Sequence, residues 1–151
     1  MPVLGKVATP GYIPTFKFLV TIDGISIDPM EGWSKVSGLK WELEEIKTRT
    51  GTDVAADRKL PGRLTIGDVT LERPTQGADV MYQWANRCAH GANERHTVHI
   101  QMQRSNGEMV RQITLYGAWI KSAAWPDLDA SASNMGSESY TLAVEMAEIT
   151  E

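Results

Sequence analysis

The feature that most constrains this chain is an alternation of apolar and polar side chains, with a period of two residues, along much of its length. Such alternation is typical of β-strands that bury one face and expose the other. It occurs at residues 16–22, 39–43, 98–102, 113–119 and 140–146. We therefore expect a mainly β protein, either a small β-barrel or a two-sheet sandwich.

One segment, residues 79–88, departs from this pattern and predicts an α-helix. Asp79 can cap free amide groups at its start, and Gly91 suits the left-handed conformation that often follows a helix end. The apolar positions are three and four residues apart, as one face of a helix requires: Val80, Met81, Trp84 and Cys88. A single helix among several strands is expected to pack on the sandwich or barrel as a flanking element.

Turn residues predict how neighbouring strands are connected. The pair Asn106-Gly107 suits the two positive-φ positions of a type I′ turn, so a β-hairpin is expected there. Between residues 64 and 71 the alternation changes phase at Gly67-Asp68, which predicts a β-bulge.

Two stretches lack periodicity and are expected to be loops. Residues 48–62 are polar and end in Pro61-Gly62, whereas residues 127–139 are rich in Ser, Ala, Asn and Gly. A loop of this length in a compact domain is usually a binding loop or a disordered one. Without a visible repeat or linker, residues 1–151 are expected to form a single domain.

The charge balance argues against several partners. With 15 Lys and Arg against 19 Asp and Glu, the net charge is −4, too acidic for a generic nucleic-acid or anionic-membrane binder. No apolar run approaches the roughly 20 residues that span a bilayer, and neither a membrane anchor nor a secretory signal is expected. Cys88 is the one cysteine, which excludes an intramolecular disulfide and fits a reducing compartment.

Candidates for catalysis are few. His96 and His99 are three residues apart on a predicted strand, so they point to opposite faces and cannot easily share a metal ion. Cys88 lies on the apolar helix face, where a structural thiol is expected, and the carboxylates of residues 42–45 do not converge. Phosphate-binding glycine motifs do not occur in the sequence. We expect no catalytic residue, metal site or cofactor, and an assembly or binding module rather than an enzyme.

The five tryptophans divide into two groups. Trp41, Trp84 and Trp119 fall on apolar faces and are expected in the core. Trp33 and Trp125 lie near turn residues, where a tryptophan can belong to an interface instead of the core.

Five short motifs follow one another along the chain: FKFLVTIDG (16–24), GWSKVSGL (32–39), RKLPGR (58–63), VTLER (69–73) and MYQW (81–84). In order and spacing they resemble the tail tube protein family of contractile phages and related extracellular injection particles. The resemblance extends from Phe16 to Met146, and it departs from the family pattern at Pro74, where members carry glycine.

This resemblance implies a β-barrel or two-sheet sandwich with one flanking helix, similar to the haemolysin-coregulated protein of type VI secretion. It implies a non-enzymatic subunit whose hexameric rings stack into a hollow tube for DNA or protein cargo. Such a subunit is made in the bacterial cytoplasm and becomes part of a phage tail or a released injection particle. Its implied partners are further copies of itself and the sheath, baseplate, tape-measure and terminator proteins.

The resemblance also implies roles for two groups of residues. One sheet face is expected to line the bore with polar side chains along which cargo slides without specific binding: His99, Gln101, Gln103, Gln112 and Thr114. The first long loop is expected to contact the next ring or subunit through Asp53, Asp57, Arg58, Lys59, Leu60, Pro61, Gly62 and Arg63.

Two alternatives stay open at this point. A secreted ring protein of the type VI kind would carry effectors in individual rings rather than form a continuous tube. A small β-barrel enzyme or ligand carrier would need a convergent polar pocket with a perturbed titratable group.

Overall fold

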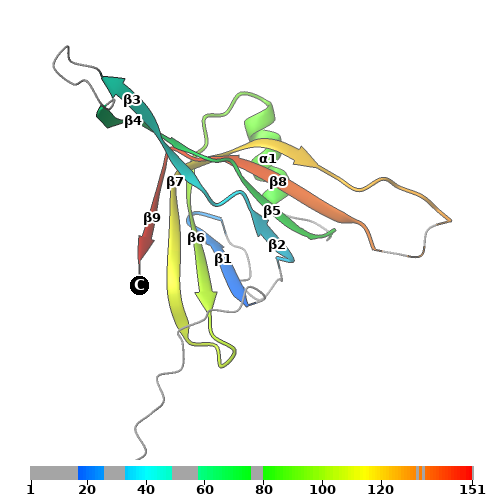
Figure 1. Ribbon diagram of the computed structural model, residues 1–151. Coiled ribbons are helices and arrows are strands. Elements are labelled where there is room, and N and C mark those ends of the chain that lie inside the picture. The colour runs from blue at the N-terminus through cyan, green and yellow to red at the C-terminus, as the bar shows by residue number, and fades with distance from the viewer. Residues whose placement is uncertain are drawn as a thin grey trace, which may run out of the picture.

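The structure is a computed structural model that describes residues 17–25, 33–48, 58–75, 80–131, 133 and 135–150. Within these residues the chain forms nine strands and one helix, so the mainly β prediction with a single helix is confirmed (Figure 1). In chain order the elements are β1 (Phe18–Ile22), β2 (Lys35–Ser37), β3 (Trp41–Thr48), β4 (Arg58–Ile66), β5 (Val69–Pro74), α1 (Val80–Ala89), β6 (His96–Gln103), β7 (Met109–Ala124), β8 (Ser137–Ala143) and β9 (Met146–Thr150).

Seven strands form an antiparallel sheet in the order β1-β6-β7-β8-β5-β2, with β9 also paired to β7. This sheet bends into two layers, one built on β6 and β9 and the other on β8 and β5 (Figure 1). The described strands do not close into a barrel, so the two-sheet form of the prediction is the one observed. The remaining strands, β3 and β4, pair with each other outside both layers.

The 16-residue strand β7 joins the two layers. Its first part pairs with β9 as far as Tyr116, and its last part pairs with β8 from Trp119 onward. Gly117 lies between these parts with φ +64°, a conformation that costs other residues roughly 1–2 kcal/mol. The backbone therefore bends at the glycine without ending the strand.

The core lies between the two layers. Alternate residues point inward, as the period-two pattern predicts, and they are almost completely buried. Each side chain of this size contributes roughly 1.5–3 kcal/mol when it leaves water. The inward side chains include Val20, Val98, Ile100 and Leu115 from one layer, Val69, Leu71, Tyr140 and Leu142 from the other, and Met81 and Trp84 from α1.

Helix α1 confirms the predicted helix with a shift of one residue. Asp79, the expected cap, lies outside the described residues. At the other end Gly91 has φ +91°, its amide donates to the Cys88 carbonyl, and the Ala92 amide donates to the Arg87 carbonyl. These two hydrogen bonds are a Schellman motif, which satisfies carbonyls that the helix end would leave free.

The hairpin between β6 and β7 is present, but the predicted type I′ turn is wrong. That turn needs positive φ at two residues, and here Gly107 has positive φ whereas Asn106 does not. The Gly107 amide donates to the Arg104 carbonyl and the Arg104 amide to the Glu108 carbonyl. This is a three-residue loop, a type I turn followed by a left-handed glycine, which uses the same Asn-Gly pair differently.

The predicted bulge at Gly67-Asp68 is also wrong, because these residues separate two strands. β4 ends at Ile66 and pairs with β3, whereas β5 begins at Val69 and pairs with β8 and β2. The change of phase marks the point at which the chain passes from one sheet to another. A Cβ atom added to Gly38 here would lie 2.1 Å from the Asp68 carbonyl oxygen, so the two connecting segments pass as closely as only glycine allows.

Parts of both predicted loops are strands instead. Residues 58–62 belong to β4, and residues 137–139 belong to β8. Pro61-Gly62 lies within β4 instead of ending a loop. The pairing register of β3 and β4 shifts by one residue beside this Pro-Gly pair, which is a β-bulge. A bulge tolerates proline because the amide that proline lacks has no ladder partner to lose. This permits a strand where a polar Pro-Gly sequence predicts a loop.

The five tryptophans do not all lie where the sequence predicts. Trp84 is fully buried as predicted, but Trp41 and Trp119 are exposed by 58% and 37%. Trp41 lies on β3, outside the two layers, so more than half of its side chain stays out of the core. The sequence allows an interface position for both Trp33 and Trp125. Trp33 is buried, whereas Trp125 is exposed.

Candidate assembly surfaces

Strands β3 and β4 form an arm that projects from the two-layer body (Figure 1). Trp41 pairs with Ile66 near its base, and all residues of β3 are exposed. A two-stranded hairpin is marginally stable alone in water, and this one carries large apolar side chains that nothing described covers. They are Trp41, Leu43, Ile46, Leu60 and Leu64. The arm is therefore a surface that a partner can cover.

The arm also holds the basic residues expected at a contact. Arg58 to Arg63 lie in β4, and Asp53 and Asp57 lie outside the described residues. The Lys59 ammonium is 3.3 Å from the Glu45 carboxylate, but both side chains are largely exposed. Exposed pairs of this kind contribute roughly 0–1 kcal/mol. Lys59 is consequently available to a partner at little cost to the fold.

A polar face covers the outer side of β6 and β7, opposite the core. His99 pairs with Thr114 and Gln101 pairs with Gln112 in the ladder, so four of the five predicted residues lie together. Gln103 continues the same strand face. The inward neighbours on these strands, Val98, Ile100, Ile113 and Leu115, are core residues. Alternation thus separates an apolar face from a polar one, as the sequence predicts.

Hydrogen bonds link the polar face into a network. Gln112 Nε2 donates to His99 Nδ1 at 3.0 Å and to Thr114 Oγ1 at 3.2 Å, and its Oε1 accepts from Gln101 Nε2 at 3.3 Å. With Nδ1 accepting, the His99 proton lies on Nε2 and is donated to Asp23 Oδ2 at 3.1 Å. The amides and hydroxyls mostly satisfy one another, so few are left to bind a passing molecule strongly.

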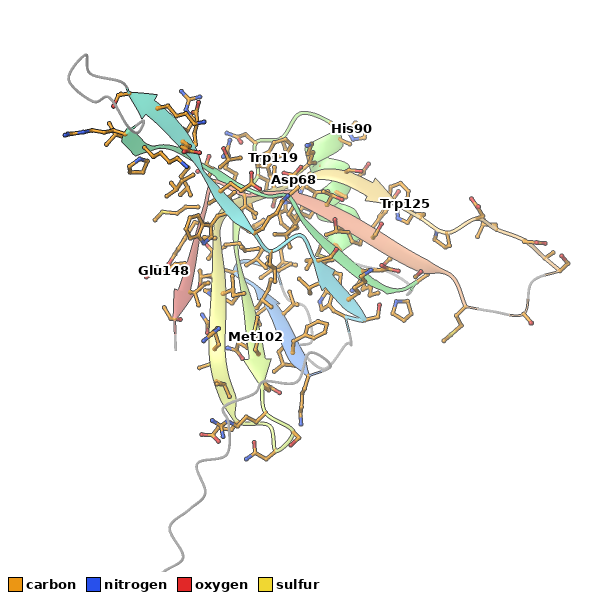
Figure 2. All side chains as sticks on the ribbon, in the orientation of Figure 1. Asp68, His90, Met102, Trp119, Trp125 and Glu148 are labelled. Carbon is orange, nitrogen blue, oxygen red and sulfur yellow. The ribbon has the colours of Figure 1, made fainter. Side chains whose placement is uncertain are left out.

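Acidic side chains border this face. Thr114 pairs with Glu148 on β9, and Glu148 projects away from the body (Figure 2). Tyr116 Oη donates to Glu148 Oε2 at 3.0 Å, and this hydrogen bond raises the pKa of Tyr116. Together with Asp23, Glu148 makes the border of the polar face acidic.

The described residues do not gather the side chains that would hold a metal ion. They contain no cluster of three or more His, Cys, Asp or Glu side chains. His96 Nε2 lies 3.1 Å from Glu94 and its ring packs edge-on against Trp84, away from the contacts of His99. Cys88 is half-buried on α1, with its thiol directed at the Glu94 carbonyl. No described helix is long and apolar enough to cross a membrane.

Sequence reasoning missed a buried ion pair at one end of the core. Arg73 on β5 and Glu138 on β8 are direct ladder partners, and Arg73 Nε donates to Glu138 Oε1 at 2.8 Å. Both side chains are buried, and the guanidinium lies 4.9 Å from the centre of the Trp33 ring. The sequence does indicate that Arg73 is buried, because Arg73 has the same parity along its strand as the inward-pointing Val69 and Leu71.

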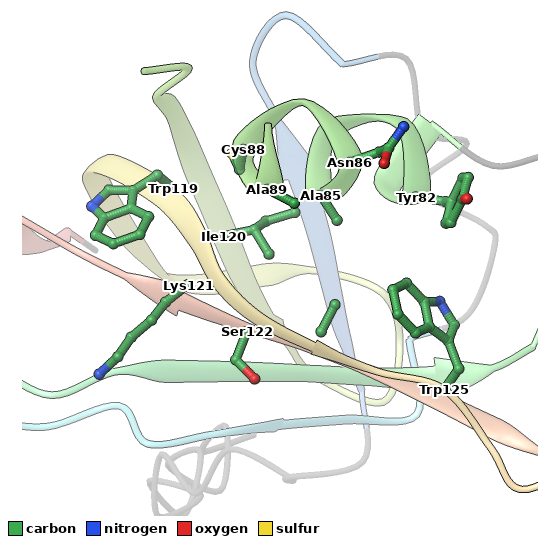
Figure 3. Close-up of a pocket in the computed structure, with 11 residues that line it drawn as sticks. Tyr82, Ala85, Asn86, Cys88, Ala89, Trp119, Ile120, Lys121, Ser122 and Trp125 are labelled. Carbon is green, nitrogen blue, oxygen red and sulfur yellow. The ribbon is translucent and has the colours of Figure 1, made fainter. Parts of the chain in front are cut away.

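A groove of about 360 Å³ separates α1 from the second half of β7 (Figure 3). Tyr82 and Trp125 form one wall, with ring centres 5.9 Å apart in an edge-to-face arrangement, and Trp119 lies at the other end. Lys121, which also lines the groove, forms an ion pair with Asp68 at 2.8 Å. The groove is open and lacks a convergent set of polar groups, so it has the character of a contact surface.

Known proteins share this architecture. A chain of the PVC sheath-tube complex of an extracellular contractile injection system is 23% identical, with a TM-score of 0.80 over 95% of this chain and 93% of that one. A chain of the anti-feeding prophage tube-terminating cap is 24% identical, with a TM-score of 0.82 over 99% of both chains. Hcp1 from Flavobacterium johnsoniae is 12% identical, with a TM-score of 0.51 over 87% of this chain and 93% of that one.

Sequence comparison gives the family. No curated protein matches the chain closely. The family described as T4-like virus tail tube protein gp19 matches residues 14–148, nearly the whole sequence. The order of motifs, the two-layer fold and this match agree, and the chain belongs to the T4-like virus tail tube protein family.

Proposed function

We propose that this protein forms hexameric rings that stack into the inner tube of a contractile phage tail or injection particle. The arm is the observation that carries the proposal. It holds five exposed large apolar side chains on two strands outside the core, and a second copy would remove them from water. In a tube, each subunit packs against identical subunits, so a second copy is the partner expected to cover the arm.

The polar face supports a role as the wall of the bore. His99, Gln101, Gln112 and Thr114 bond mainly to one another, and Gln103 extends their face. Acidic groups at the border repel phosphate rather than bind it. DNA or protein cargo would therefore pass without specific binding, and the subunit would act mechanically rather than as an enzyme.

Assembly with other components follows from the same proposal. Sheath, baseplate, tape-measure and terminator proteins are the proposed partners, and the subunit would leave the bacterial cytoplasm as part of a virion tail or a released particle. Negative-stain electron microscopy with light scattering tests the proposal. Hollow tubes with six-fold cross-sections are the expected result. Isolated rings that carry bound proteins would favour the type VI kind of secreted ring, which the likeness to Hcp1 keeps as the second candidate.

Charge reversal on the arm tests the proposed contact with the next ring. Lys59→Glu is expected to leave the monomer folded, because the side chain is exposed and its pair with Glu45 is weak. It should shorten the tubes or raise the concentration that they need. Lys59→Arg keeps the charge and serves as the matched control. Tubes of unchanged length in Lys59→Glu would contradict a role for this residue in stacking.

A further inference from the structure

An apolar pocket of about 220 Å³ opens at the base of the arm. Val69 and Leu115 form its floor and belong to the buried core, whereas Trp41 and Ile149 at its rim are more than half exposed. The pocket thus reaches from the exposed rim down to the edge of the core. The lining consists of Leu39, Lys40, Trp41, Ile66, Val69, Ile113, Leu115, Ala147 and Ile149.

An exposed apolar side chain lies on the other side of the molecule. The connection from β7 to β8 extends away from the body on the side opposite β9 and the arm (Figure 1). Leu128 on this connection is 96% exposed, more than any other large apolar side chain described. Asp127 and Asp129 flank it. The connection therefore presents one apolar side chain between two carboxylates.

The pocket and this side chain are complementary in size and charge. An apolar cavity of about 150 Å³ can hold a benzene molecule, so 220 Å³ has room for a leucine side chain. The Lys40 ammonium on the pocket wall forms no hydrogen bond or ion pair with the described residues. Asp127 likewise has no such partner among them. A cation and a carboxylate that both lack a partner among the described residues would meet if Leu128 entered the pocket.

We propose that Leu128 of one copy occupies the pocket of a second copy and places Asp127 beside Lys40. Within one chain the two features lie on opposite sides of the body, so they can meet between copies only (Figure 1). A contact between two different patches is head-to-tail, and it closes into a ring or continues along a filament. The inference rests on the proposed function, since it requires that copies of this chain assemble.

Cysteine cross-linking tests the contact directly. In a Cys88→Ser background, Leu128→Cys is combined with Ile149→Cys at the pocket rim, and the assembled protein is oxidised. We expect a ladder of disulfide-linked oligomers on a denaturing gel. A ladder that ends at six places the contact within a ring, a longer one places it between rings, and both support the contact. Leu128→Cys with Tyr82→Cys, at the rim of the other groove, is the matched control.

Two results would overturn the contact while the proposed function survives. One is tubes in the microscope without a ladder from the Leu128–Ile149 pair. The other is a ladder from the Tyr82 control alone. If the unsubstituted chain forms no assembly under any condition, the proposed function fails and this contact fails with it.

A charge exchange provides an independent measurement. Leu128→Ser is expected to raise the concentration needed for assembly by about tenfold or more, because it removes a buried leucine from each contact. Lys40→Asp should weaken assembly, and adding Asp127→Lys should restore it. Thermal unfolding of the unassembled chains should show an unchanged fold. Equal assembly of Leu128→Ser and the unsubstituted chain would refute the contact.

Discussion

Removing one partner of the buried ion pair is expected to destabilise the subunit severely. Arg73 is fully buried and Glu138 is 4% exposed, with a 2.8 Å hydrogen bond between them. Glu138→Ala leaves the guanidinium in the core without this carboxylate, and breaking such a pair costs about 3–5 kcal/mol. For a chain of this length each kcal/mol lowers Tm by about 2–4 °C, so Tm should fall by about 6–20 °C.

Urea unfolding of the unassembled chain, followed by tryptophan fluorescence, measures this cost. The control is the double variant Arg73→Met with Glu138→Leu, which removes both charges and keeps apolar volume. It should be less destabilised than either single variant, because both charges leave the core together. A loss below about 1 kcal/mol for Glu138→Ala, or additive losses in the double variant, would refute the reasoning.

The remaining predictions concern two glycines and one tyrosine. Gly38→Ala should cost well over the roughly 1–2 kcal/mol of a left-handed residue, because its Cβ would meet the Asp68 carbonyl. Gly91→Ala has open space around its Cβ and should cost about 1–2 kcal/mol. Equal losses of unfolding free energy in urea would contradict this reasoning. Burial raises the pKa of Tyr140 to about 12, so the folded protein favours the neutral phenol over the phenolate. Its contribution to stability should be complete below about pH 10 and lost as the pH rises toward 12. Phenolate absorbance checks this, and a titration curve that Tyr140→Phe leaves unchanged near pH 12 would count against it.

Alternation predicted most of the body because most of its strands, among them β1, β5, β6 and β8, bury one face. At residues 98–102 and 140–142 the apolar side chains enter the core, and the polar face of β6 and β7 follows from the same parity. The strand predicted over residues 140–146 instead ends at Ala143, and Met146 begins β9 with its side chain exposed. His99, Gln101, Gln112 and Thr114 come together because two strands with this period pair in register. The helix was predictable for the same reason, since its spacing places one stripe of side chains against the sheets.

The arm could not be predicted, because the period of a strand does not tell what covers it. Leu39, Trp41 and Leu43 alternate as a core strand does, yet β3 has no second layer against it. The polar sequence near Pro61 suggested a loop, although its backbone pairs with β3. The contact roles of Asp53 and Asp57 stay predictions. In the proposed tube a second copy of the chain covers these residues, and no pattern within β3 could reveal this.

The path of β7 determines how the subunit carries mechanical load. Its backbone passes from one layer into the other at Gly117 without a break. A pull on β6 or β9 therefore enters β7 through ladder hydrogen bonds, crosses between the layers along the covalent backbone, and reaches β8 through a second set of ladder hydrogen bonds. Two layers joined by side-chain packing alone could slide past each other under shear. Here, sliding would have to break ladder hydrogen bonds on both edges of β7 together. The subunit should therefore transmit thrust along this strand as a single stiff body.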